Sequence, residues 1–186
     1  MPTGCRDCNK GLKMAYNPNA EKCKACVAIT ECRDDYSYVD GTNNLVRIHK
    51  NHGKNEKVDN IKIAKYLSNK YGYKIDLLSI PQKQGIKEAD TYNYTLKCKQ
   101  EYKTLKTFTY NAIDKAIQKG SKQANDIVLS FNSKINFELL TNALNDRLKR
   151  CPNVETITLI VKNKAKVYTR DEIINENFKS QQEDFI

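Results

Sequence analysis

Two acidic side chains and one lysine between residues 90 and 103 have the types and the spacing to hydrolyse a phosphodiester. Glu101 and Lys103 stand two positions apart in a segment typical of a β-strand, so their side chains should project from the same face. Asp90 begins the preceding segment, and a hairpin would bring its carboxylate across to this pair. Two carboxylates can hold Mg²⁺ or Mn²⁺, which lowers the pKa of a bound water. The lysine would orient that water or stabilise the transition state.

The same strand face carries further basic residues, which fit two interpretations. Lys97 and Lys99 precede Glu101 and Lys103 at the same two-residue spacing, so they would share this face. There they would steer a phosphate backbone toward the carboxylates. An ordinary solvated strand with salt bridges has the same pattern, and so short a motif recurs by chance. The spacing alone therefore leaves both a catalytic site and a charged surface open.

Two other groups of polar residues are candidates for contact with a substrate. Lys115, Lys119 and Gln123 recur at four-residue spacing along an expected helix and its end, where they would line a cleft or form an exposed face. His49 and His52 are the only histidines. A ribonuclease that works without a metal needs a base for the 2′-hydroxyl, and the pKa of histidine suits that role. A loop histidine is more often simply solvated.

The cysteines near the N-terminus indicate a structural zinc site. Cys5 and Cys8 form one CxxC pair, Cys23 and Cys26 form a second, and Cys32 follows closely. Two such pairs can supply four thiolates in a tetrahedron, which leaves no coordination position open for a substrate. Cys32 could replace one of the four. Disulfides or free thiols are the alternative, which a chain that is not exported makes less favourable.

The formal net charge of +10 is concentrated in residues 37–170, which carry +13, whereas residues 1–36 carry +1 and residues 171–186 carry −4. A region this basic favours a partner with a phosphate backbone, RNA or DNA. A solvated lysine-rich surface is the alternative. No apolar run approaches the roughly 18 residues of a membrane span, and the N-terminus lacks the pattern of a secretory signal. We therefore expect a cytoplasmic protein without a membrane partner.

Hydrophobic periodicity predicts the elements that would position these side chains. Helices are expected at residues 56–71, 109–119 and 137–150. Strands are expected at residues 73–80, 89–95, 97–105, 126–131, 154–161 and 165–169. This order predicts an α/β (α+β) fold with a mixed central sheet flanked by helices. The expected organisation is a zinc-binding module at 1–36, a linker at 37–55, an α/β domain at 56–172 and an acidic tail at 173–186.

Asp90, Glu101 and Lys103, after a helix that carries Glu56, resemble the core motif of the PD-(D/E)XK nucleases. The resemblance implies a restriction-endonuclease-like fold in which Asp90 and Glu101 bind the catalytic metal and Lys103 assists the reaction. It also implies that Glu56 joins the site. The sequence departs from the motif at Ala89, where a proline usually precedes the aspartate.

A more specific resemblance covers roughly residues 49–172. Segments 52–78, 89–105, 122–129 and 154–169 are similar to the nuclease-toxin domains at the C-terminal ends of contact-dependent growth inhibition proteins and of phage minor head proteins. This similarity implies cleavage of RNA, tRNA above all, or of DNA, with an immunity protein or a phage structural protein as partner. Some related phage domains belong instead to the barnase, EndoU, colicin and RelE group, which cleaves RNA without a metal. A non-catalytic zinc module that binds nucleic acid is a further alternative.

Overall fold

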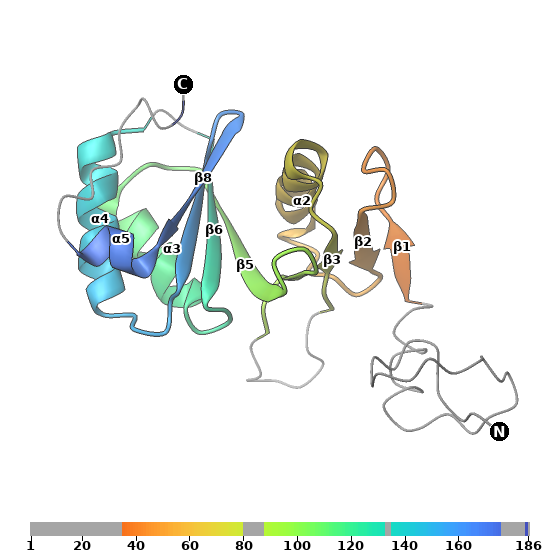
Figure 1. The fold of residues 1–186 in the computed structure, drawn as a ribbon, viewed down its shortest axis with the longest axis horizontal. Helices are drawn as coiled ribbons and strands as arrows, with labels where there is room; N and C mark the ends of the chain where they lie inside the picture. Colours follow the sequence, from red (N-terminus) through yellow and green to blue (C-terminus); the bar gives the residue numbers. More distant parts are fainter. Residues whose placement is uncertain (1–34, 80–87, 133–134, 176–184, 186) are drawn as a thin grey trace, which may run out of the picture. The chain divides into compact units, whose positions relative to one another are not determined.

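The computed structural model describes residues 35–79, 88–132, 135–175 and 185 (Figure 1). The chain divides into two compact units, Met1–Ser37 and Tyr38–Ile186, and nearly all described residues belong to the second. Residues 1–34 of the expected zinc module, with all five of its cysteines, lie outside the described residues. The loop at 80–87 and most of the expected acidic tail lie outside them as well.

The described residues form a mixed sheet of eight strands, whose order in the sheet is β1 to β8, the same as their order in the sequence. The strands are β1 Tyr36–Tyr38, β2 Val46–His49, β3 Ile75–Leu77, β4 Thr91–Asn93, β5 Cys98–Leu105, β6 Asp126–Phe131, β7 Thr156–Val161 and β8 Lys164–Thr169. β2 pairs with β3 in parallel, and β5, β6 and β7 form a second parallel group. The β3–β4, β4–β5 and β7–β8 pairs are antiparallel. The predicted mixed sheet is therefore confirmed.

The helices of the described residues begin and end where local chemistry favours it. They are α2 Lys57–Tyr71, α3 Tyr110–Gly120, α4 Phe137–Lys149 and α5 Arg170–Ile174. The side chains of Thr109 and Asn136 accept hydrogen bonds from backbone N–H groups in the first turns of α3 and α4. α2 ends at Gly72, whose φ of 68° lies in the left-handed region that glycine adopts without strain. None of the described helices is long and apolar enough to cross a bilayer.

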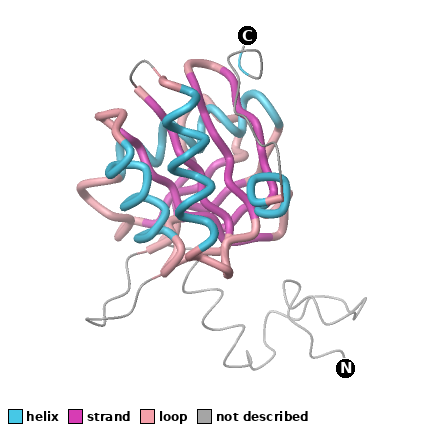
Figure 2. The backbone as a smooth tube through the Cα atoms, turned by 90° about the vertical axis from the view of Figure 1, so that its left-hand side faces the viewer, coloured by secondary structure: helices cyan, strands magenta, loops and turns pink. Residues whose placement is uncertain are grey.

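Two hydrophobic clusters lie on opposite faces of the central strands. In β6, Ile127 and Leu129 belong to the cluster covered by α3 and α4, whereas Val128 between them belongs to the cluster covered by α2. Figure 1 shows α3 and α4 on one side of the strands and α2 on the other. Figure 2, turned by 90°, shows helices lying across the strands. β6 is thus buried on both faces, as expected for the middle of a parallel group.

The structure departs from the sequence-based expectations in several places. β1 Tyr36–Tyr38 was not expected, and β4 Thr91–Asn93 is shorter than the expected strand at 89–95. Val46–His49, inside the expected linker, forms β2, because Val46 and Ile48 alternate into the α2-side core with 0% and 7% of their surface exposed. β3 is shorter than the expected strand at 73–80. Lys97 lies in the β4–β5 turn with a φ of 59° and does not belong to β5. The short helix α5 was not expected.

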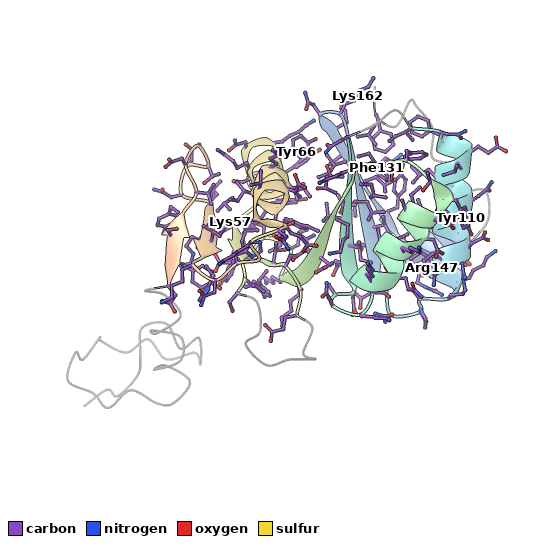
Figure 3. The ribbon with its side chains drawn as sticks, turned by 180° about the vertical axis from the view of Figure 1, so that it is seen from behind. Lys57, Tyr66, Tyr110, Phe131, Arg147 and Lys162 are labelled. Atoms are coloured by element: carbon purple, nitrogen blue, oxygen red, sulfur yellow. The ribbon has the colours of Figure 1, made fainter. Side chains whose placement is uncertain are left out.

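A cluster of ion pairs joins α3 to α4 and leads to a stability prediction. Arg147 Nε donates to Asp114 Oδ1 at 2.6 Å, a second guanidinium nitrogen donates to Asp114 Oδ2, and both side chains are largely buried. Figure 3 shows Arg147 beside these helices. We expect Asp114→Ala to lower the free energy of unfolding by about 2–3 kcal/mol, because charge-assisted hydrogen bonds are lost and Arg147 stays without its partner.

Urea denaturation at neutral pH checks this expectation, with Lys115→Ala on the exposed side of α3 as the matched control. The hydrogen bond from Arg147 lowers the pKa of Asp114 below its ordinary value of 3.8. The contribution of the pair is therefore present above that value, and it is lost as the pH falls through the lowered pKa. Equal losses of stability in the two variants would contradict the assignment.

Candidate active site

Asp90 and Glu101 meet where β4 stops pairing with β5. The β4–β5 register ends at Thr91 opposite Gln100, so from Glu101 onward this side of β5 has no further strand pairing among the described residues. Instead, the Tyr102 backbone N–H donates to Asp90 Oδ2 at 3.0 Å. The Asp90 backbone N–H in turn donates to Glu101 Oε2 at 3.1 Å. These two hydrogen bonds hold the two carboxyl groups together at an open side of β5.

Lys103 completes the group in the way that strand alternation predicts. Its Nζ lies 2.6 Å from Glu101 Oε1, which confirms that the two side chains share a face. The same Nζ lies 3.5 Å from Glu56 Oε1, at the residue that precedes α2. Four side chains from three segments, Glu56, Asp90, Glu101 and Lys103, are thus brought together.

The C-terminal end of α3 packs directly against Glu101. Gln123 Nε2 donates a hydrogen bond to Glu101 Oε1. A Cβ at Gly120 would lie 3.4 Å from Glu101 Cγ and 3.1 Å from Ile127 Cδ1, so glycine allows this close approach. Gln123 therefore supports the carboxylate, a role different from the substrate contact expected of it. Neither its partner nor the requirement at Gly120 can be recognised from sequence spacing.

Burial raises the pKa values of both carboxyl groups. The Glu101 side chain has 0% of its surface exposed. Burial, followed by repulsion from Asp90, raises the pKa of Glu101 to about 8 from an ordinary value of 4.5. Burial also raises the pKa of Asp90, although Lys103 opposes that rise. Burial alone would lower the pKa of Lys103, but the charges of Glu101, Asp90 and Glu56 outweigh it and raise the pKa.

The oxygens of this group fit a hard divalent cation. Within the described residues, no set of three or more His, Cys, Asp or Glu side chains is arranged to enclose a metal ion. Mg²⁺, however, commonly binds through one or two carboxylates and completes its octahedron with waters and phosphate oxygens. Asp90 and Glu101 supply two such carboxylates, and a cation between them would offset the burial and the repulsion from Asp90 that together raise the pKa of Glu101.

The other basic candidates do not reach the carboxylates. Lys99 is exposed on β5, two residues from Glu101, and Lys97 lies in the turn at the far end of the hairpin. Lys115 and Lys119 are exposed on α3, and Lys119 directly precedes Gly120. Each of these lysines is therefore exposed, outside the contacts that Asp90 and Glu101 make.

His52 is held in the interior by both of its ring nitrogens. Its Nδ1 lies 2.6 Å from the Leu78 carbonyl oxygen, which can only accept, so Nδ1 carries the proton. Its Nε2 lies 3.1 Å from Asn60 Nδ2 and accepts from it. The residue has 4% of its surface exposed. His52 thus joins the loop after β2 to the end of β3 and to α2, which leaves neither nitrogen available to a substrate.

His49 is also buried. Only 7% of its surface is exposed, and its Nδ1 accepts a hydrogen bond from the Asn51 backbone N–H. It lies at the end of β2, a strand separated from β5 by β3 and β4. In the described residues, neither histidine therefore has the exposed nitrogen that a general base acting on a bound ribose requires.

The geometry of His52 leads to a prediction that separates a structural role from a catalytic one. We expect His52→Ala to lower the free energy of unfolding by about 2–4 kcal/mol, because it removes a buried side chain and leaves Asn60 Nδ2 and the Leu78 carbonyl unpaired. Any loss of activity should follow the loss of folded protein. Thermal unfolding, together with activity per folded molecule, checks this. A stable His52→Ala protein without activity would contradict it.

Comparison with known proteins gives one structural likeness. The chain is similar to the CdiA-CT/CdiI toxin and immunity complex from Burkholderia pseudomallei, with a TM-score of 0.42 and 16% sequence identity. The alignment covers 62% of this chain and 85% of that chain. No protein-family model and no curated protein matches the sequence. The function proposed below rests on contacts among the described side chains.

Proposed function

We propose that the protein is a metal-dependent nuclease that hydrolyses phosphodiester bonds of RNA, with tRNA as the favoured substrate, or of DNA. The supporting observation is the convergence of Asp90, Glu101 and Lys103 at the open side of β5, with Lys103 Nζ 2.6 Å from Glu101 Oε1. Two carboxylates beside one ammonium group are the set that this hydrolysis requires. Residues 37–170, with their charge of +13, provide the attraction for a polyanionic substrate.

Each side chain has a distinct role in this mechanism. Asp90 and Glu101 would hold Mg²⁺ or Mn²⁺ through their oxygens, and Gln123 keeps Glu101 in place by a hydrogen bond. The cation, when bound, lowers the pKa of water and neutralises charge on the phosphate. Lys103 orients the attacking water and stabilises the negative charge that develops on the phosphate oxygens. Glu56, which is more exposed, fixes the position of the Lys103 ammonium group.

Other parts of the expected function remain predictions. A structural zinc at Cys5, Cys8, Cys23 and Cys26 concerns residues outside the described ranges, and so does the place of Cys32. An immunity protein or a phage structural protein as partner is likewise proposed from the sequence resemblance. The restriction-endonuclease-like assignment within the PD-(D/E)XK superfamily has the same standing. None of these is needed for the chemistry assigned to Asp90, Glu101 and Lys103.

A substrate panel tests the proposal. Purified protein would be incubated with labelled tRNA, single-stranded DNA and double-stranded DNA, in the presence of Mg²⁺ or Mn²⁺. A Glu101→Ala/Lys103→Ala variant would be run in parallel, without chelators that would also remove zinc. We expect cleavage of at least one substrate by the wild type and none by the variant. Equal cleavage by both proteins would contradict the proposal, and so would binding of every substrate without cleavage.

A further inference from the structure

A polar pocket lies between α2 and the ends of three parallel strands, on the face of the sheet covered by α2. Its volume is about 260 Å³. Thr104 on β5 and Ser130 on β6 are register partners, and Ser130 is the partner of Ile160 on β7, so their side chains form one row across the sheet. Lys162, just beyond β7, extends the lining to the β7–β8 turn.

The pocket lies at the carboxyl ends of three parallel strands. β5, β6 and β7 are parallel, and the pocket residues Thr104, Ser130 and Ile160 all lie in the last two positions of their strands. Figure 3 places Tyr66 on α2 toward these strand ends and Lys162 at the turn beyond them. The pocket is therefore built from a strand-end row, a helix and a turn.

Tyr66 contributes a hydroxyl group without a partner. Tyr66 lines the pocket, and its buried Oη has no hydrogen-bond partner among the described residues. A buried hydroxyl without a partner is costly, so a polar atom placed beside it would gain a hydrogen bond at little further desolvation. Ser130 and Asn132 add a second hydroxyl and an amide to the same lining. These groups can form hydrogen bonds with a sugar hydroxyl or with the polar edge of a base.

The charges at the rim favour an anion. Lys62 and Lys162 both line the pocket and are exposed. The single acid in the lining, Asp59, has its Oδ1 3.9 Å from Lys62 Nζ. One carboxylate cannot neutralise two ammonium groups, so the rim keeps an excess of positive charge. A phosphate would find its counter-charge at these lysines.

The size of the pocket restricts the ligand. A volume of 260 Å³ is several times the roughly 30 Å³ that one water occupies in the liquid. It lies just under the roughly 300–1,000 Å³ of ordinary small-molecule sites. A single nucleotide, with a phosphate at the lysines and its sugar or base inside, matches this size and this arrangement of charge and hydroxyl groups.

The pocket adjoins the candidate active site on two elements. Thr104 follows Lys103 on β5, so these two side chains face opposite sides of the strand, and Asp59 lies one turn of α2 beyond Glu56. The Lys103 and Glu56 side chains are themselves 3.5 Å apart. We propose that the pocket binds one nucleotide unit of the substrate strand, on the side of β5 opposite the phosphodiester held at Asp90 and Glu101. This inference rests on the proposed nuclease function, and it adds a determinant of substrate binding that the carboxylates do not supply.

Binding of mononucleotides to the full chain tests the pocket without any cleavage. Adenosine and cytidine 5′-monophosphate and inorganic phosphate would be titrated into ¹⁵N-labelled protein, with the Glu101→Gln variant measured in parallel. We expect the nucleotides to shift the backbone amide signals of Ser130, Asn132 and Lys162 in both proteins. We expect inorganic phosphate to bind more weakly. No shift of these signals at millimolar nucleotide, or equal affinity for phosphate alone, would overturn the proposal.

Three variants test the assigned contacts. Tyr66→Phe removes only the unpaired hydroxyl, so the melting temperature should not fall, while nucleotide affinity should drop about three- to tenfold. Lys62→Gln/Lys162→Gln should weaken binding by a similar or larger factor. Lys149→Gln, an exposed lysine on α4, is the matched control and should bind normally. Unchanged affinity in both pocket variants would overturn the assignment.

Cleavage kinetics separate this inference from the proposed function. If the protein cleaves oligonucleotides, the pocket variants should raise KM severalfold and leave kcat nearly unchanged, because they act on binding and not on the reacting atoms. An unchanged KM would overturn the placement of the pocket on the substrate path. Nucleotide binding by a wild type that cleaves nothing would defeat the nuclease proposal, but the pocket would remain a nucleotide site.

Discussion

Glu101→Gln should reduce the rate of cleavage by about 10²–10³-fold or more, because the amide has the shape of the carboxylate but not its charge. Glu101 receives hydrogen bonds from the Asp90 backbone N–H, Gln123 and Lys103, and it is fully buried. The substituted amide keeps one oxygen that can accept from Lys103 and Gln123, but its NH2 group would face the Asp90 backbone N–H, so thermal unfolding of the variant is measured alongside its activity. Loss of activity would then report the loss of metal affinity and of charge at the reacting phosphate.

Single-turnover cleavage of the preferred substrate, with saturating Mg²⁺, measures this effect. Glu56→Gln is the matched control, because Glu56 also contacts Lys103 but is 56% exposed and 3.5 Å away. Its rate should fall only severalfold, since exposed ion pairs contribute little. The same large loss in both variants would mean that the carboxylates act through Lys103 alone. Full activity of Glu101→Gln would remove Glu101 from the mechanism.

Activity should rise with pH across the neutral range, and the protein free of divalent cations should become less stable over the same range. In the folded chain the pKa of Glu101 is raised to about 8, against 4.5 for the ordinary group. The folded state therefore holds this proton more tightly than the unfolded state. The stabilising effect of this proton is complete below pH 4.5, and it is lost as the pH rises toward 8.

The same proton competes with the metal, because a cation binds the deprotonated carboxylate. Below the raised pKa, kcat/KM should therefore increase by up to about tenfold per pH unit. Lys103 stays charged throughout this range, since the opposing burial is outweighed by Glu101, Asp90 and Glu56 and its pKa lies above the ordinary 10.5. No decline caused by Lys103 is expected below that value.

Thermal unfolding and steady-state kinetics over the range of about pH 6 to 9 check both parts, since this range spans the raised pKa. In Glu101→Gln, the loss of stability with rising pH that is assigned to Glu101 should be absent. Addition of Mg²⁺ to the wild type should raise the melting temperature more at alkaline than at acidic pH. A pH-independent effect of Mg²⁺ would contradict the link between the cation and the Glu101 proton.

The sequence predicted the catalytic candidates because their relation is local. Glu101 and Lys103 are two apart on a strand, which places them on one face whatever the fold. The 2.6 Å ion pair between Lys103 Nζ and Glu101 Oε1 follows from that alternation. Asp90 is brought across by a single hairpin. The proximity of Glu56 was implied by the family resemblance and not by spacing, since 47 residues separate it from Lys103.

The remaining features depend on tertiary packing, which spacing does not encode. The hydrogen bond of Gln123 to Glu101 requires the end of α3 to lie against β5, and Gly120 is required only because of that contact. A histidine in a loop could act as a general base, but the His52 side chain is buried and bonded to Leu78 and Asn60. β2 was missed because its two core residues, Val46 and Ile48, follow a run of turn-forming residues.

Equilibrium binding of Mn²⁺ tests the central claim most directly, because it needs neither a substrate nor a choice between RNA and DNA. Isothermal titration of the full chain would be carried out slightly above the raised pKa of Glu101, which is about 8. The wild type should bind Mn²⁺ at a site that is lost in Asp90→Asn/Glu101→Gln and retained in Glu56→Gln. Undiminished binding in the double variant, or no binding by the wild type with or without nucleic acid, would contradict the account.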